Sequence, residues 1–278
     1  MITPSRLRAS VVDPQTEWTR RRLQALLVGG LALVLALLVG GIWSIVMLLQ
    51  EPDSGPADGG EPGGAAAADT ADARDELAER TLSASTLDEA KPGALSTGTT
   101  GTIRLPVPTG MGPAGVLTGY PATPEGALAQ LAAIDQAALS SLRVAGAQAV
   151  IKEWAASGGP TTESWSGVKA VAGFLSSAGV GADGADRLVL NVTPSMGLIK
   201  GTVGDDFVVP CLNMVVEVTD TTANRAPVQV AVADCQRMVW SEDRWIIGPG
   251  QEPAEAPSLW PGTQASYDAG YQWLETTP

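Results

Sequence analysis

An uncharged stretch from residue 23 to residue 50 restricts this chain more than any other feature, and Arg20, Arg21 and Arg22 stand directly before it. A hydrocarbon core of about 30 Å needs roughly 20 apolar helical residues, so this stretch is long enough to cross a membrane. Residues 1–22 carry five arginines against two acids, whereas Glu51 and Asp53 open the other side. This asymmetry predicts a cytoplasmic N-terminus and an extracytoplasmic remainder.

Two kinds of N-terminal segment fit an apolar run after basic residues. A cleaved signal peptide has an apolar region of roughly 7–15 residues, about half the length found here, and ends at a small-residue cleavage site. We therefore interpret residues 23–49 as an uncleaved signal anchor that contacts membrane lipid, after a basic cytoplasmic head at 1–22. Ala32, Ala36, Gly40 and Ser44 recur every fourth residue in this span. They form a small-residue face on which another span could pack.

The composition excludes several classes of function. The net charge is −13, and residues 103–278 carry seventeen acids against nine bases, so direct nucleic-acid binding is not expected. Histidine is absent, which excludes the Ser-His-Asp and Cys-His classes of enzyme and removes the commonest metal ligand. No phosphate-loop or dinucleotide-binding glycine pattern occurs. We therefore expect no enzymatic activity, metal or cofactor.

The exported part begins with a change in composition. Residues 50–102 are rich in Gly, Ala, Pro and acids and have few large apolar residues, so they are predicted to be a disordered acidic linker. Residues 103–121 are punctuated by Pro and Gly and are expected to be extended.

Residues 122–250 have the pattern of an α+β domain. Helical apolar spacing covers residues 123–142, 144–156 and 162–178, with Thr123 and Thr162 as N-caps. Strand patterns follow at 187–193, 195–202, 207–220, 227–239 and 245–247. Helices followed by strands predict helices packed on a curved antiparallel sheet. Residues 251–278 are expected to be a tail with a short helix at 263–274.

The two cysteines test the pairing of the long strands. If residues 207–220 and 227–239 form a hairpin with Cys211 opposite Cys235, Val218 faces Val228 and Met214 faces Val232 on the other side of the sheet. A one-residue slip would destroy this pattern. We therefore predict a Cys211–Cys235 disulfide on the less buried face of the sheet; the alternatives are a redox-active pair and a metal site.

Several carboxylates were considered as catalytic bases. Asp205 and Asp206 follow Gly204 and are interpreted as a solvated turn, and Asp135 as a residue at the edge of a helix. Asp234 would have a raised pKa if its face of the strand is buried. None of them has a second catalytic partner in the sequence.

The exported domain resembles the nuclear transport factor 2-like (cystatin-like) cone. The resemblance rests on the order of helices and long strands and on the closing hairpin 238–247 (MVWSEDRWII). With the single span, the layout is similar to inner-membrane assembly subunits of conjugative type IV secretion systems from Gram-positive elements. The stretch 119–127 (GYPATPEGA) resembles the first-helix entry in membrane proteins of actinobacterial mobile elements.

The resemblance implies a scaffold that oligomerises and docks other subunits of a membrane complex. Two alternatives stay open: an accessory protein of another cell-envelope system, such as a lipid importer, and a tethered module whose cone pocket holds a small apolar ligand. A deep pocket lined by Trp154, Trp165 and Phe174 would favour the ligand-binding module. A pocket filled by those side chains would favour scaffolding.

Overall fold

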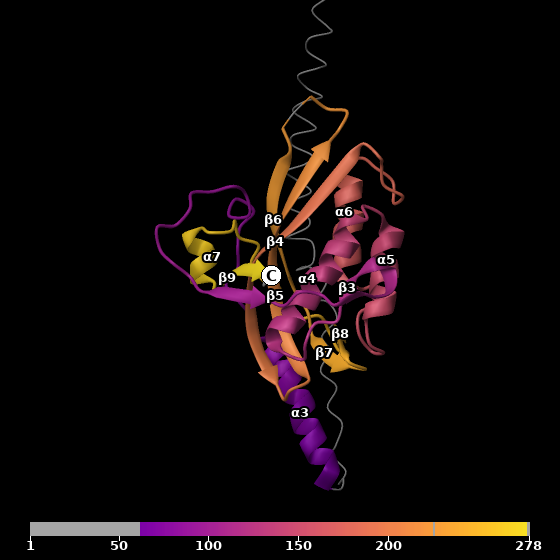
Figure 1. Ribbon diagram of the computed structural model, residues 1–278, viewed down its shortest axis with the longest axis vertical. Coiled ribbons are helices and arrows are strands. Elements are labelled where there is room, and N and C mark those ends of the chain that lie inside the picture. Colours follow the sequence, from indigo (N-terminus) through magenta and orange to yellow (C-terminus); the bar gives the residue numbers. More distant parts are fainter. Residues whose placement is uncertain (1–61, 225, 277–278) are drawn as a thin grey trace, which may run out of the picture.

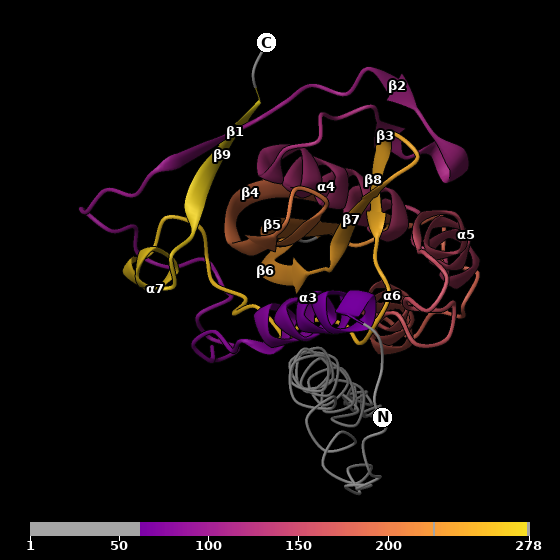
Figure 2. The ribbon, with the colours of Figure 1, turned by 90° about the horizontal axis from the view of Figure 1, so that it is seen from below.

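A computed structural model of the chain describes residues 62–224 and 226–276 (Figure 1). Within these residues, no helix is long and apolar enough to cross a membrane. The basic head 1–22, the span predicted at 23–49 and its small-residue face lie outside the described residues. The described part of the chain is an α+β domain in which helices pack on a strongly curved sheet (Figure 2).

Three central helices follow the predicted order, but only the first begins at its predicted N-cap. Thr123 caps the first of them by accepting a hydrogen bond from the Gly126 N–H at 3.1 Å, as predicted. The third begins at Ser166 rather than after Thr162, so the predicted Thr162 cap is wrong. The helices are α3 (Pro62–Glu79), α4 (Pro124–Ser140), α5 (Val144–Trp154), α6 (Ser166–Ser177) and α7 (Gln264–Asp268), with a 3₁₀ turn η1 at Pro113–Gly115.

The described strands form a seven-stranded sheet and a small separate hairpin. The sheet order is β1-β9-β4-β5-β7-β8, and β6 also pairs with β5. All pairings are antiparallel except that of β1 with β9, which is parallel, so the expected wholly antiparallel sheet is corrected at this edge. The strands are β1 (Thr102–Leu105), β4 (Leu188–Val203), β5 (Phe207–Asp220), β6 (Val228–Cys235), β7 (Met238–Ser241), β8 (Arg244–Ile247), β9 (Gln272–Thr276) and the hairpin β2 (Gly110–Met111) with β3 (Leu117–Thr118).

The long strand β4 differs from the two strands predicted in its place. It runs through Pro194 without ending, but its register with β5 shifts between Pro194 and Met196. This bulge changes the side of the sheet on which even-numbered residues lie. Val192 consequently packs in the core with the central helices, whereas Met196 packs with the disulfide on the other face.

The closing hairpin is confirmed and is tighter than a simple strand-turn-strand pattern suggests. The segment expected as one strand at 227–239 is divided into β6 and β7, and β7 then turns into β8 through Glu242 and Asp243. Both turn residues have positive φ, at 50° and 62°, as two-residue hairpins require. Trp240 faces Trp245 across the hairpin with ring centroids 5.4 Å apart and an edge-on geometry.

The expectation of a disordered linker from residue 50 to residue 102 is wrong for its described part. α3 occupies residues 62–79, and its last turn packs on the sheet through Leu77 and the fully buried Ala78, against Phe207 and Val209. Alanine permits this close approach of a helix to a sheet, so a composition poor in large apolar residues still packs. Further along, the backbone N–H of Ala231 donates to the carbonyl of buried Ala90 at 2.7 Å.

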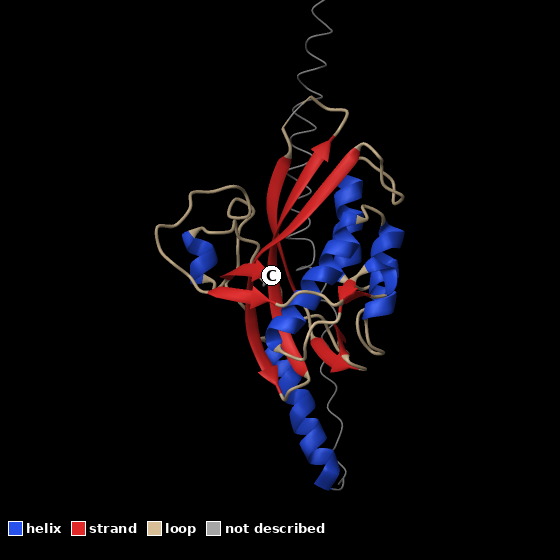
Figure 3. Cartoon of the chain, viewed as in Figure 1, coloured by secondary structure: helices blue, strands red, loops and turns tan. Residues whose placement is uncertain are grey.

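The C-terminal tail is also part of the folded domain. Its helix ends at Asp268 instead of continuing to residue 274, and the chain then forms β9 between β1 and β4. The tail covers the face of the sheet opposite α4, and α7 lies beside it (Figure 3). The central strands are therefore covered on both faces.

Candidate functional site

The cysteines form the predicted disulfide. Cys211 and Cys235 lie opposite each other with a Cα–Cα distance of 4.1 Å, and the predicted pairs, including Val218 with Val228, are confirmed. The prediction that they lie on the less buried face is wrong, because the tail covers them and leaves them 0% and 4% exposed. The bond lies in an apolar cluster with Met196, Leu198, Ala256, Leu259 and Tyr271. Its burial indicates a structural role.

The aromatic residues proposed to line a pocket fill the interior instead. Trp154 and Trp165 are both fully buried in the main core, and Phe174 is partly buried against it. The indole N–H of Trp154 donates to the carbonyl of Pro113 at 3.1 Å, and the Arg244 guanidinium lies 5.0 Å from the Trp154 ring centroid. Trp154 therefore joins α5 to η1 and to the closing hairpin.

A group of three acids lies between the central helices and the sheet; Asp135 is buried, and Asp234 and Glu252 are half-buried. The Glu252 carboxylate accepts hydrogen bonds at 3.1 Å from the backbone N–H of Ser166, the first residue of α6. The Gln236 amide donates to Asp234 at 3.0 Å and to Glu252 at 3.1 Å. Asp135 on α4 is only 4% exposed, so its assignment to a helix edge is wrong. One of its carboxyl oxygens has no hydrogen-bond partner among the described residues.

Burial determines the protonation of this group. It raises the pKa of Asp135 well above its usual range, and the charges of Asp234 and Glu252 raise it further. Burial, followed by the charge of Glu252, raises the pKa of Asp234 to about 7. Among the described residues, no cluster of three or more His, Cys, Asp or Glu side chains is arranged to hold a metal ion. Hydrogen bonds of Asp234, Gln236 and Glu252 form a polar link between α6, the end of β6 and the tail.

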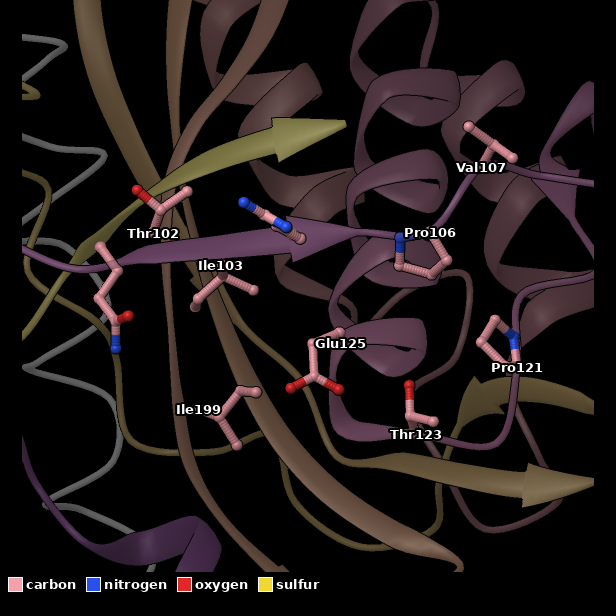
Figure 4. Close-up of a pocket in the computed structure, with 10 residues that line it drawn as sticks. Thr102, Ile103, Pro106, Val107, Pro121, Thr123, Glu125 and Ile199 are labelled. Atoms are coloured by element: carbon pink, nitrogen blue, oxygen red, sulfur yellow. The ribbon is translucent and has the colours of Figure 1, made fainter. Parts of the chain in front are cut away.

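An open cavity of about 830 Å³ lies at the β1 edge of the sheet. Figure 4 shows β1 with β9 on one side and Ile199, Glu125 and Thr123 on the other. Ile103 and Ile199 provide apolar surface from β1 and β4, and Pro121 closes the end near α4. We call this cavity the edge groove. It is a surface feature, distinct from the filled core beneath α4.

The edge groove contains charges of both signs that pair with nothing nearby. Arg104 is exposed on β1 and Glu125 is partly exposed in the first turn of α4, and both line the groove. No ion pair joins either of them to another described residue, whereas Arg74, for example, pairs with Asp206 at 2.7 Å. Unpaired charges beside apolar side chains suit a ligand with mixed polar and apolar groups.

The chain was compared with known proteins at the level of families, sequences and structures. No family model, curated protein or solved structure matches it. The resemblances to the nuclear transport factor 2-like cone and to secretion subunits therefore stay predictions, and the edge groove must be interpreted from its own chemistry.

Sequence reasoning missed the edge groove because its walls come from distant segments. Residues near 103, 121, 199 and 272 meet only after the tail strand β9 has inserted between β1 and β4. In the sequence, Glu125 has only the character of an acidic residue in the first turn of a helix. Two signals were present: β1 is a four-residue strand that ends at Pro106, and edge strands are commonly short and followed by proline.

Proposed function

We propose that this protein is a non-catalytic, membrane-anchored docking domain, an assembly subunit of a machine that spans the cell envelope. The uncharged span with its arginine flank supports the anchor. The N-terminus then lies in the cytoplasm and the folded domain outside the membrane. The absence of histidine from the sequence supports a role without acid–base catalysis.

One observation carries the choice of docking over ligand storage. The space between helices and sheet, where a cone-shaped domain would hold a small molecule, contains the fully buried Trp154 and Trp165. The open edge groove lies on the outside, against a strand edge. A filled interior and an open exterior groove favour recognition of another polypeptide over storage of a small apolar ligand.

The packed α3 also changes how far the domain can lie from the membrane. The predicted span ends at residue 49 and α3 begins at Pro62, so twelve residues connect them. Twelve residues reach at most about 43 Å when fully extended. A domain held this close to the bilayer suits a subunit that docks neighbours in the same membrane complex.

The finer assignment follows the resemblance in the sequence. We propose a nuclear transport factor 2-like cone in a conjugative type IV secretion-like complex, with self-association as a further element of assembly. The alternative of a lipid-importer accessory protein shares the same docking domain and differs in its partners.

Crosslinking of the full-length chain in its native membrane, followed by mass spectrometry, tests the proposal. We expect crosslinks from the domain to several membrane subunits, and a C-terminal tag that external protease removes from intact spheroplasts. Permease and lipid-binding partners would instead support the importer alternative. A tag that is protected until the membrane is opened would contradict the proposed topology.

A further inference from the structure

The free edge of β1 has backbone groups with no partner in the sheet. β1 is the last strand on its side and pairs only with β9. The Trp273 N–H donates to the carbonyl of Gly101 at 3.0 Å, so Gly101 and every second residue after it direct their backbone groups toward β9. The backbone N–H and C=O groups of Thr102 and Arg104 therefore point to the opposite, unpaired edge.

The edge groove lies directly along this unpaired edge. The lining of the groove includes three successive residues of β1, namely Thr102, Ile103 and Arg104. Because successive side chains of a strand point to opposite faces, the groove follows the edge of β1 and not one face. Beyond the edge lie Ile199 of β4 and Glu125 of α4 (Figure 4). The groove thus combines backbone hydrogen-bonding groups, apolar surface and one carboxylate.

We propose that the edge groove binds an extended segment of another protein, which adds to β1 as a further strand and places a lysine or arginine beside Glu125. This inference rests on the proposed docking function and names the surface and the kind of partner. Strand addition uses unpaired backbone groups for affinity and side-chain pockets for specificity. Apolar side chains at alternate positions of the segment would contact Ile103 and Ile199.

Charge favours a basic segment. Glu125 has no ion-pair partner among the described residues. Arg104 lines the same groove with the opposite charge, but the surrounding excess is negative, since residues 103–278 carry seventeen acids against nine bases. Such a field attracts a basic segment and repels an acidic one. The edge groove is also accessible, because β1 and β9 lie on the side of the domain away from α3, from which the chain continues toward the predicted span (Figure 2).

The decisive experiment measures binding of two labelled peptides to the full-length chain in lipid nanodiscs by fluorescence anisotropy. One peptide alternates valine with lysine and threonine; the other has glutamate in place of lysine. We expect the lysine peptide to bind at least tenfold more tightly than the glutamate peptide. Glu125→Lys should reverse this preference.

Arg104 supplies a matched pair of variants for the backbone contribution. Arg104→Pro removes the outward N–H and leaves the bonds of Ile103 and Leu105 to β9 in place, because proline is tolerated on an edge strand. Arg104→Ala keeps the N–H and removes the charge. We expect Arg104→Pro to weaken the lysine peptide at least tenfold relative to Arg104→Ala. Should Arg104→Pro fail to fold, slower hydrogen exchange of the wild-type Thr102 and Arg104 amides on peptide binding replaces this comparison.

Three results would overturn the inference: no binding of either peptide to the wild-type chain, equal binding by the two Arg104 variants, or unchanged exchange at β1. Self-association of the wild-type chain that Arg104→Pro abolishes would assign the groove to a second copy and also overturn it. Peptide binding without crosslinks to membrane subunits would reject the proposed function but leave the groove intact.

Discussion

The two faces of the central strands β4, β5 and β6 are both buried, but by different means. The helix face packs against α4, on which α5 and α6 pack in turn, and its largest buried side chains are Trp154, Trp165 and Trp245. The opposite face, which we call the tail face, is covered by α3 and residues 251–271. It contains the Cys211–Cys235 disulfide and the apolar side chains that surround it.

Specific polar contacts attach the coverings of the tail face. The Asn213 amide donates to the carbonyl of Leu259 at 2.7 Å, and the Tyr271 hydroxyl donates to the carbonyl of Pro257 at 3.1 Å. The Lys200 ammonium donates to the carbonyls of Ala78 and Ala254 at 3.2 and 3.0 Å, joining the end of α3 to the tail. Apolar contact with regular helices stabilises the helix face, whereas individual hydrogen bonds attach irregular chain to the tail face.

The largest effect should come from the helix face. Trp165→Ala removes a fully buried indole, and the resulting cavity should lower the free energy of unfolding by about 3–5 kcal/mol. Denaturant titration followed by circular dichroism measures it. Trp273→Ala, at a residue 37% exposed on β9, is the matched control and should cost much less. Equal losses would show that the helix core is not the main source of stability.

The second largest effect should come from the tail face. Replacing Cys211 and Cys235 together by alanine opens the loop that the disulfide closes and should lower the free energy of unfolding by about 3 kcal/mol. Thermal unfolding with and without reductant measures the same loss in the wild-type chain. Two free thiols in a non-reducing mass measurement of the wild type would reject the disulfide.

Removing a single hydrogen bond on the tail face should have a smaller and more local effect. Asn213→Ala leaves the carbonyl of Leu259 without its buried donor, at a cost of about 1–3 kcal/mol. Hydrogen exchange should accelerate in residues 256–262 while α4 and α6 keep their protection. Uniform acceleration of hydrogen exchange across both faces would contradict the idea that separate hydrogen bonds hold the tail.

A separate effect concerns pH and should originate on the helix face. Because the folded-state pKa values of Asp135 and Asp234 are raised, the native chain holds protons that the unfolded chain has released. Stability should therefore fall by at least about 1 kcal/mol as the pH rises from 5 to 8, since one pKa unit corresponds to about 1.4 kcal/mol. Asp135→Asn should reduce this fall in stability. An unchanged profile of stability against pH would show that Asp135 is not its source.

Lys200 on the tail face has the opposite linkage. Burial, followed by the charge of Arg80, lowers its pKa to about 8, so above that pH the native chain binds fewer protons than the unfolded chain. Its contribution to stability should rise between about pH 8 and pH 10, opposite in sign to the carboxyl effect. Asp135→Asn and Lys200→Met should alter different parts of one unfolding profile.

The sequence predicted well those elements that are specified by a short local motif or by the alternation of buried and exposed side chains. The Thr123 cap of α4 was predictable because a cap bonds only to the first turn of its own helix. The Cys211–Cys235 register was predictable because side chains alternate between the two faces of paired strands. The helix face, built from periodic helices and the Phe207–Asp220 strand, was accordingly predictable. The bulge at Ser195 was not, because one extra residue leaves no clear pattern in the composition.

The sequence by itself determined the three central helices, the central hairpin, its disulfide and the sharp division between the uncharged span and the acidic remainder, because local periodicity and charge specify them. Only the tertiary structure decided that α3 packs on Phe207 and Val209, that the tail covers the disulfide, that Glu252 serves the start of α6, that Asp135 is buried, and that β1 borders an open groove. These features depend on contacts between separate segments of the chain, which arise from packing and not from any pattern within one segment.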